Sequence, residues 1–350
     1  MKKIFIVLTI IFFAAAVPVF MLSCGSGGSG SGGGFINQSS SPGNVALFVT
    51  DDLGTYRKVK VTINDIRLMH MGSGASCDIL EDPVELDITD LSSVLQLLDV
   101  TSCPSINYNR VVIELDKRTV LTDAGNVSSD CNLATYKNEQ GGTNTLQCGA
   151  TCTINMSGAV NVQASKTSSV ALDFDLKGFE VDHFGQPNCS LTMKVFPLNS
   201  ADFEKKHNDG FREGISGLIS NVDTVKKTFT LTADSGVFTV TYDDINAPGI
   251  DDLLALAVAD QLEVRVESLI IDLDTRKIAA TALIVEADGP VSALNSIAGT
   301  FTLTYQTNKT MLIDYLTADV EGILLNGSQV EVKLKGFELS RYLAAEVEVK

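Results

Sequence analysis

One pattern occurs twice in the C-terminal part of the chain, and this duplication constrains the fold more than any other feature. The run TFTLT at residues 228–232 recurs at 300–304, and QLEVRV at 261–266 recurs as QVEVKL at 329–334. The order of the segments is kept while their separation falls from 72 to 68 residues. Matched order with a shrinking separation indicates a duplicated unit whose second copy has lost loop length.

Each copy has the size and pattern of a small closed barrel. About five strand-like runs fit into each copy, and residues 251–258 of the first copy form an apolar segment that predicts a helix. Five strands with one inserted helix are typical of an OB-like barrel. The G-x-I, F-T-L and V-x-V runs of both copies resemble domain of unknown function 5666. We therefore expect two tandem small OB-like β-barrels, at residues 214–288 and 289–350.

The region before the duplication has strand patterns in a different layout. Residues 58–63 alternate strictly, with Lys or Thr on one face and Val or Ile on the other. Residues 90–98 begin with an Asp suited to capping and continue with apolar residues at helical spacing, which predicts a short helix. Further strands are expected at residues 45–50, 110–121, 169–176 and 191–198. These patterns predict a β-sandwich over residues 44–198, and the polar residues 199–213 predict a linker, so the whole protein should be all-β.

Five segments of this region follow one another in an order found in a known bacterial family. They are VALFVTDD at 45–52, VKVTINDIRLMH at 59–70, LDITDLSSVL at 86–95, YNRVVIEL at 108–115 and VALDFD at 170–175. In these segments the region resembles domain of unknown function 4382. The family has Ala-Pro where this chain has DLG at 52–54, and a cysteine-rich insertion lies around residues 123–160. The resemblance implies an exported immunoglobulin- or transthyretin-like β-sandwich and brings no established activity with it.

The N-terminus has the layout of an export signal followed by a lipid anchor. Lys2 and Lys3 precede an uninterrupted apolar run, and Cys24 follows that run almost directly. The sequence MLSC at residues 21–24 resembles the lipobox of bacterial lipoproteins, in which cleavage falls before the cysteine and its thiol receives a diacylglycerol. We expect residues 1–23 to be a signal peptide and Cys24 to be the lipidated first residue of the mature chain. An uncleaved membrane anchor and plain secretion are the alternatives.

The residues after Cys24 bear on where the protein resides and what it meets there. Residues 24–43 are rich in Gly and Ser and predict a flexible tether. Gly25 stands where lipoproteins retained at the inner membrane commonly have Asp, so the resemblance implies the outer membrane. The chain has 26 Lys and Arg against 43 Asp and Glu, a net charge of −17, which disfavours nucleic-acid binding. We expect the membrane as partner through the lipid, and a protein or glycan of the cell envelope as ligand.

The other cysteines predict a disulfide-stabilised domain. They all lie within the first region, and an even number in an exported chain is typical of disulfides, here with 15 pairings open. A zinc site or a redox pair is the alternative, although the spacing of Cys148 and Cys152 is not that of a thioredoxin motif. The six candidates are Cys77, Cys103, Cys131, Cys148, Cys152 and Cys189.

The sequence offers no set of side chains for catalysis. The three histidines are far apart, and no metalloprotease, P-loop or nucleophile-elbow motif occurs. We therefore expect neither enzymatic activity nor a cofactor. Asp173 and Asp175 share one face of a predicted strand and are weak candidates for a Ca²⁺ site, with a solvated outer sheet face as the alternative. The predicted function is a binding or scaffold module of the cell envelope, and the alternative is a glycan- or calcium-binding module.

Overall fold

Strands make up most of the chain, so the all-β prediction is confirmed. The structure, a computed structural model, describes residues 41–350 with the exception of residues 53 and 81. The predicted signal peptide, the predicted lipidation site Cys24 and nearly all of the predicted tether lie outside the described residues. In the part of the chain that is described, no helix combines the length and apolar character needed to cross a membrane.

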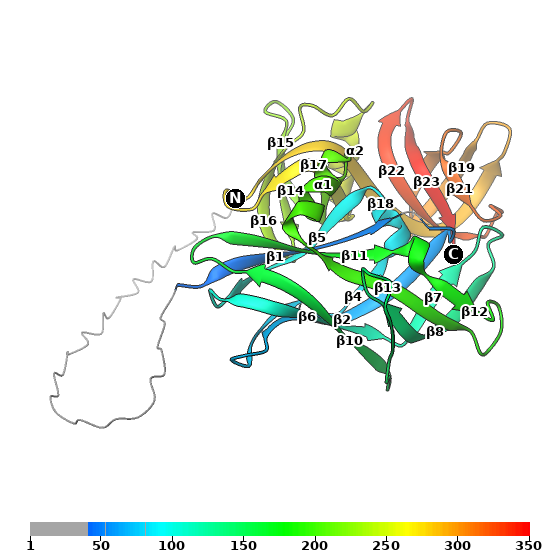
Figure 1. Ribbon diagram of the computed structural model, residues 1–350. Helices are drawn as coiled ribbons and strands as arrows, with labels where there is room; N and C mark the ends of the chain where they lie inside the picture. The colour runs from blue at the N-terminus through cyan, green and yellow to red at the C-terminus, as the bar shows by residue number, and fades with distance from the viewer. Residues whose placement is uncertain (1–40, 53, 81) are drawn as a thin grey trace, which may run out of the picture. The chain divides into compact units, whose positions relative to one another are not determined.

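The first region forms two layers of strands around a buried core (Figure 1). In the first layer, β1 pairs with β5 on one side and with β11 on the other, and β11 pairs with β13. In the second layer, the central strand β2 pairs with β6, and β6 pairs in turn with β10. The strands of this region are β1 (Gly43–Asp52), β2 (Lys58–His70), β3 (Ala75–Leu80), β4 (Val84–Asp87), β5 (Val94–Cys103), β6 (Asn107–Asp116), β7 (Arg118–Thr122), β8 (Ser128–Lys137), β9 (Thr143–Thr145), β10 (Thr151–Asn161), β11 (Thr167–Asp175), β12 (Glu180–Asp182) and β13 (Ser190–Leu198).

The layer that contains β1 is buried on both faces. Leu47 and Val49 point into the core between the two layers, whereas Ala46 and Phe48 belong to the core of the C-terminal region. Ala171 of β11 lies on that second face as well. A strand covered on both sides needs apolar residues at nearly every position, which is why the β1 sequence is a continuous apolar run rather than an alternating one.

Three disulfides connect the six cysteines of this region. They pair Cys77 with Cys103, Cys131 with Cys189, and Cys148 with Cys152. The expectation of disulfides is thus met, and one of the 15 pairings is selected. The structure also contains two short 3₁₀ helices here, Ile88–Leu91 (η1) and Leu176–Gly178 (η2).

The helix predicted for residues 90–98 is wrong. The chain forms η1 instead, where Asp87 accepts a hydrogen bond from the N–H of Thr89, and β5 follows. β5 pairs with β1, and both faces of it are covered, so its apolar residues fall at positions that imitate helical spacing. Tertiary pairing therefore overrides the local pattern.

A short helix occupies much of the predicted linker. α1 (Ser200–Asn208) begins at Asn199, whose side chain accepts hydrogen bonds from two N–H groups of the first turn. Phe203 of α1 packs on Phe48, with 5.5 Å between the ring centroids, so the segment covers the second face of the β1 layer.

The duplicated region forms two closed rings of strands that share one strand. In the first ring the pairing order is β14, β15, β16, β18, β17 and back to β14, and in the second it is β18, β19, β20, β23, β22 and back to β18. The long β18 contributes one half to each ring, and the boundary predicted between 288 and 289 falls inside it. The strands are β14 (Arg212–Asp223), β15 (Thr228–Ala233), β16 (Gly236–Thr241), β17 (Val264–Asp272), β18 (Lys277–Asn295), β19 (Thr300–Tyr305), β20 (Lys309–Asp314), β21 (Asp319–Glu321), β22 (Gln329–Glu338) and β23 (Arg341–Val349).

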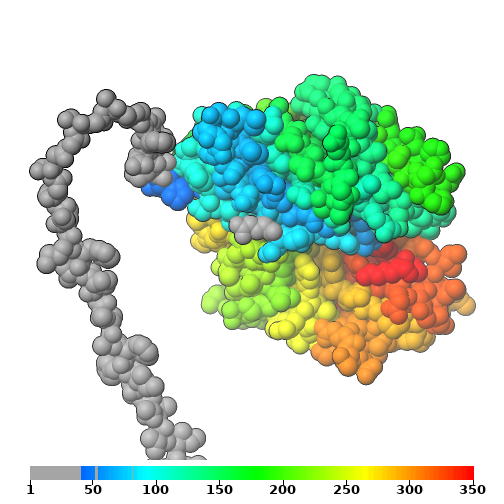
Figure 2. Space-filling model, turned by 90° about the horizontal axis from the view of Figure 1, so that it is seen from below, coloured from blue at the N-terminus to red at the C-terminus, as the bar shows by residue number. Residues whose placement is uncertain are grey.

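The predicted helix of the first copy is α2 (Ile250–Asp260), which joins β16 to β17. Its apolar face, including Leu253 and Leu254, lies in a core shared by both rings. Phe229 and Phe301 occupy equivalent positions of the two copies, and both are buried in that core. Figure 2 shows residues of the first region, blue to green, meeting those of the two rings, yellow to red, along a seam.

Candidate functional site

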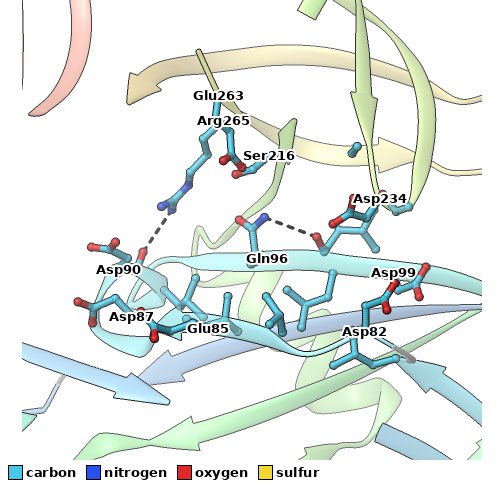
Figure 3. A pocket seen from close by; sticks show the side chains of 18 of the residues that line it. Asp82, Glu85, Asp87, Asp90, Gln96, Asp99, Ser216, Asp234, Glu263 and Arg265 are labelled. Carbon is cyan, nitrogen blue, oxygen red and sulfur yellow. Dashed lines mark hydrogen bonds between the residues drawn. The ribbon is translucent and has the colours of Figure 1, made fainter. Parts of the chain in front are cut away.

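A cavity of about 840 Å³ lies where the first region meets the two rings (Figure 3). β4, η1 and β5 form one wall, and β14, the β15–β16 turn, β17, β18, β22 and β23 contribute to the other. Apolar side chains, among them Leu80, Leu86 and Leu98, line part of the first wall. The size is within the usual range of small-molecule sites.

Carboxylates dominate the lining of this cavity. The acidic lining residues are Asp82, Glu85, Asp87, Asp90, Asp99, Asp234, Glu263, Glu286, Glu331 and Glu348. Against them stand three cationic lining residues, Lys58, Lys60 and Arg265. A recess with one prevailing sign of charge concentrates ligands of the opposite sign, so this cavity favours a cation.

Strand pairing brings three of these carboxylates together. Glu263 directly precedes β17, Glu286 lies on β18 and Glu331 lies on β22, and the N–H of Glu286 donates to the carbonyl of Glu263 at 3.2 Å. Burial, and next the charge of Glu331, raise the pKa of Glu286 to about 7. Burial also raises the pKa of Glu263, with the charges of Asp234 and Glu331 adding to the shift. The repulsion among these groups is a cost that a bound cation would relieve.

Two lysines near the cavity are held in ion pairs between the two regions. Nζ of Lys333 on β22 lies 2.7 Å from Asp90 of η1 and 3.1 Å from Glu346 of β23. Lys58 of β2 pairs with Glu348 of β23. Lys60 and Lys350 pair with two further lining carboxylates, Glu85 at 3.6 Å and Glu331 at 3.0 Å, so lysines partly balance the acidic lining.

Besides Lys58, three polar residues of the lining are buried. Gln96, Ser235 and Arg265 are 8 %, 5 % and 9 % exposed, respectively. Arg265 donates to the carbonyl of Asp90 at 3.2 Å, as Figure 3 shows. The hydroxyl of Ser235 has no hydrogen-bond partner within the described part of the chain. Buried polar groups are normally paired, so a polar ligand group or a water is expected beside Ser235.

The carboxylates that the sequence suggested for Ca²⁺ lie outside this lining. Asp173 is only 2 % exposed and lies 3.0 Å from Nζ of Lys206 on α1, while Asp175 pairs with Lys194 of β13. The alternative of a solvated outer face is wrong, because α1 and the C-terminal core cover that face. Over residues 41–350 without 53 and 81, no group of three or more His, Cys, Asp or Glu side chains is arranged to hold a metal ion.

The other residues singled out in the sequence are placed as follows. The six cysteines lie in the disulfides, and Cys24 is outside the described residues. His207 contacts Glu213 at 2.9 Å, while His70 accepts a hydrogen bond from the N–H of Ser73. None of these side chains lines the cavity.

Sequence reasoning missed the cavity because its walls come from distant segments. One signal was present: five acidic residues occur within residues 81–90, and four of them, Asp82, Glu85, Asp87 and Asp90, line the cavity. The residues of the two rings that complete the lining begin at Ser216, and nothing in a single sequence links them to this acidic run.

The comparison with protein families bears on one wall of the site. Residues 42–192 match the model of the family described as "Domain of unknown function (DUF4382)", which confirms the resemblance of the first region. No curated protein matches the chain. The wall formed by β4, η1 and β5 lies inside the matched range, and the wall formed by the two rings lies outside it.

Proposed function

We propose that this protein is a non-enzymatic, lipid-anchored binding module of the bacterial outer membrane, and that it binds a cationic ligand in the acidic cavity. The observation that carries the proposal is the cavity of about 840 Å³ with ten carboxylates and three cationic side chains in its lining. The absence of a three-carboxylate cage among the described residues favours an organic cation over Ca²⁺. The apolar part of the lining suits a ligand that has aliphatic segments between its charges.

We also propose a specific fold type for each region. The two layers of the first region support an immunoglobulin- or transthyretin-like sandwich. Each ring has the strand order 1-2-3-5-4 with a parallel pairing between strands 3 and 5, and α2 lies between strands 3 and 4 of the first ring. This arrangement supports OB-like barrels and a relationship to domain of unknown function 5666.

The anchor is tested by changing the cysteine that we assign to lipidation. Cys24→Ala should move the protein from the membrane fraction to the soluble fraction, because a lipid anchor supplies about 0.8 kcal/mol of membrane affinity per buried CH₂ group. Fractionation of whole cells, with the Ser23→Ala variant as a control that keeps the thiol, measures this. Unchanged membrane association of Cys24→Ala contradicts the lipid anchor.

The cavity is tested with spermine, a flexible tetra-cation, by calorimetry at low ionic strength. The double variant Asp234→Asn/Glu263→Gln removes two exposed lining charges and should weaken spermine binding at least about tenfold. The double variant Glu139→Gln/Glu204→Gln removes two exposed carboxylates that do not line the cavity, and it should bind as the wild type does. Binding that is absent from the wild type, or equally weakened by both variants, contradicts the proposal. Calcium chloride serves as the comparison, and preferential Ca²⁺ binding also contradicts it.

A further inference from the structure

The edge of β5, and not only its side chains, borders the acidic cavity. All six residues from Gln96 to Thr101 line the cavity. Successive side chains of a strand point to opposite faces of its sheet, so one face alone would contribute every second residue. An unbroken run of lining residues therefore means that the backbone edge of the strand faces the cavity. Residues 82–87, which include β4 of the same wall, also line the cavity without a gap.

This edge of β5 is only partly paired. On one side β5 pairs with β1 from Gln96 to Cys103, with a bulge at Leu98. On the other side β14 pairs with it in parallel, from Val94 to Gln96 and no further. Beyond Gln96, no other strand of the described chain pairs with this edge, whereas each ring of the C-terminal region closes on itself.

The side of β5 to which each residue's backbone N–H and C=O groups point can be followed along the strand. The carbonyl of Ser93 accepts from the N–H of Arg212 at 3.0 Å, so Ser93 faces the β14 side. Alternation along the strand then turns Leu97 to the same side. Leu98 is the extra residue of a bulge, since Leu97 and Asp99 face consecutive residues of β1, and the bulge turns Val100 to the β14 side as well.

Two backbone groups on this edge have local side-chain partners. The carbonyl of Leu97 accepts from the side-chain amide of Gln96 at 3.5 Å, the dashed bond beside Gln96 in Figure 3. The N–H of Val100 donates to the carboxylate of the adjacent Asp99 at 2.6 Å. Side chains of this kind substitute for a missing strand, and they are displaced when a strand is added. The unpartnered hydroxyl of Ser235, buried in the same lining, is a further group without its hydrogen bond.

We propose that the ligand is an extended, lysine- or arginine-rich peptide segment that adds as a strand to the open edge of β5. Main-chain hydrogen bonds to residues 97–101 supply affinity, and basic side chains of the segment reach the carboxylates on both walls. The five residues from 97 to 101 match the usual strand length of about five to six residues. This inference rests on the proposed function, since it names the class of cation that the cavity takes.

The first test compares three ligands on the wild-type protein. A blocked hexapeptide of alternating Lys and Val should bind, and the same peptide methylated on every backbone nitrogen should bind at least about tenfold more weakly, because methylation removes the N–H donors and keeps the charges. Spermine is the third ligand. Equal binding of both peptides overturns strand addition while leaving the cationic site in place. Failure of all three ligands to bind overturns the proposed function as well.

The second test changes the protein at the edge. Val100→Pro removes the N–H that faces the cavity and is not needed for the ladder with β1, and Val100→Ala keeps it. The proline variant should lose at least about tenfold in affinity for the unmethylated peptide and keep its affinity for spermine, whereas the alanine variant should keep both. Peptide binding by a folded Val100→Pro variant at wild-type strength overturns the proposal. If that variant does not fold, the peptide comparison on the wild type decides.

Discussion

The two regions of this protein solve the problem of strand edges in different ways. The strands of residues 214–350 close into two rings, so every ring strand has a neighbour on both sides. The layers of residues 43–198 stay open, and β4 and part of β5 keep an unpaired edge within the described chain. Open edges invite pairing with other chains, and proteins usually cover or charge them. Here the open edges line the acidic cavity in which we propose that a ligand binds.

The regions also differ in how their irregular segments are held. All three disulfides lie in the open region, and the last cysteine of the chain is Cys189. In the closed region, the helix α2 is held at both ends: Asp251 accepts from Tyr242 and Lys227, and Asp260 accepts from Tyr305 and Lys309. One ring supplies the first pair of donors and the other ring supplies the second. In the open region, disulfides thus hold the irregular segments, whereas in the closed region contacts with the two rings hold them.

The largest expected effect on stability comes from removing disulfides of the open region. Cys131→Ala/Cys189→Ala should lower the free energy of unfolding by about 4 kcal/mol, and Cys148→Ala/Cys152→Ala by about 2 kcal/mol, because the entropy lost by the unfolded chain grows with the length of the closed loop. The separations are 58 and 4 residues. Urea denaturation measures both values. Equal losses in the two double variants contradict this account.

The next effect concerns the seam between the regions. Lys333→Met leaves Asp90 and Glu346 facing each other without their shared cation, and it should cost about 3 kcal/mol of stability. Lys60→Met removes the half-buried partner of the exposed Glu85, 3.6 Å away, and should cost less than about 1 kcal/mol. Urea midpoints of the two variants give the comparison. A loss of similar size in both means that the seam does not depend on this buried lysine.

An effect of similar size depends on pH and concerns the ring wall of the cavity. The pKa of Glu286 is raised from 4.5 to about 7, first by burial and then by Glu331. Between these two values the folded protein holds a proton that the unfolded chain has lost, so the free energy of unfolding falls as the pH rises. Glu286→Gln should therefore be more stable than the wild type by about 3 kcal/mol at pH 8 and equally stable at pH 4. Thermal denaturation at both values measures this, and a gain that does not depend on pH contradicts it.

The smallest effect tests the two ends of α2. The side chain of Asp260 is 9 % exposed and that of Asp251 is 39 % exposed. Asp260→Asn should cost about 1–2 kcal/mol, because a buried hydrogen-bonded carboxylate is lost, and Asp251→Asn should cost less than about 1 kcal/mol, because water screens its ion pair. Chemical denaturation of both variants at pH 7 gives the order. A larger loss for Asp251→Asn would mean that the contacts at the Asp251 end of α2 are the more stabilising ones.

Sequence periodicity predicted the strands well wherever only local alternation mattered. The alternating residues 58–63, the equivalent TFTLT runs and the helix before Gln261 all appear in the structure. The prediction was wrong at residues 90–98, since a strand buried on both faces carries the same continuous apolar residues as a buried helix. The expectation of a solvated face around Asp173 was wrong for a related reason. Asp173 is buried, and its carboxylate lies 3.0 Å from Nζ of Lys206 on α1.

The amino-acid sequence by itself determined the all-β class, the duplication and the presence of disulfide-forming cysteines, because periodicity, repetition and cysteine number are local or countable properties. Only the tertiary structure decided the cysteine pairing, the sharing of β18 between the two rings and the place where Glu85 and Asp90 meet Glu263 and Glu331. These features depend on which distant strands become neighbours. That choice is made by the packing of whole layers, which places groups from opposite ends of the chain around one cavity.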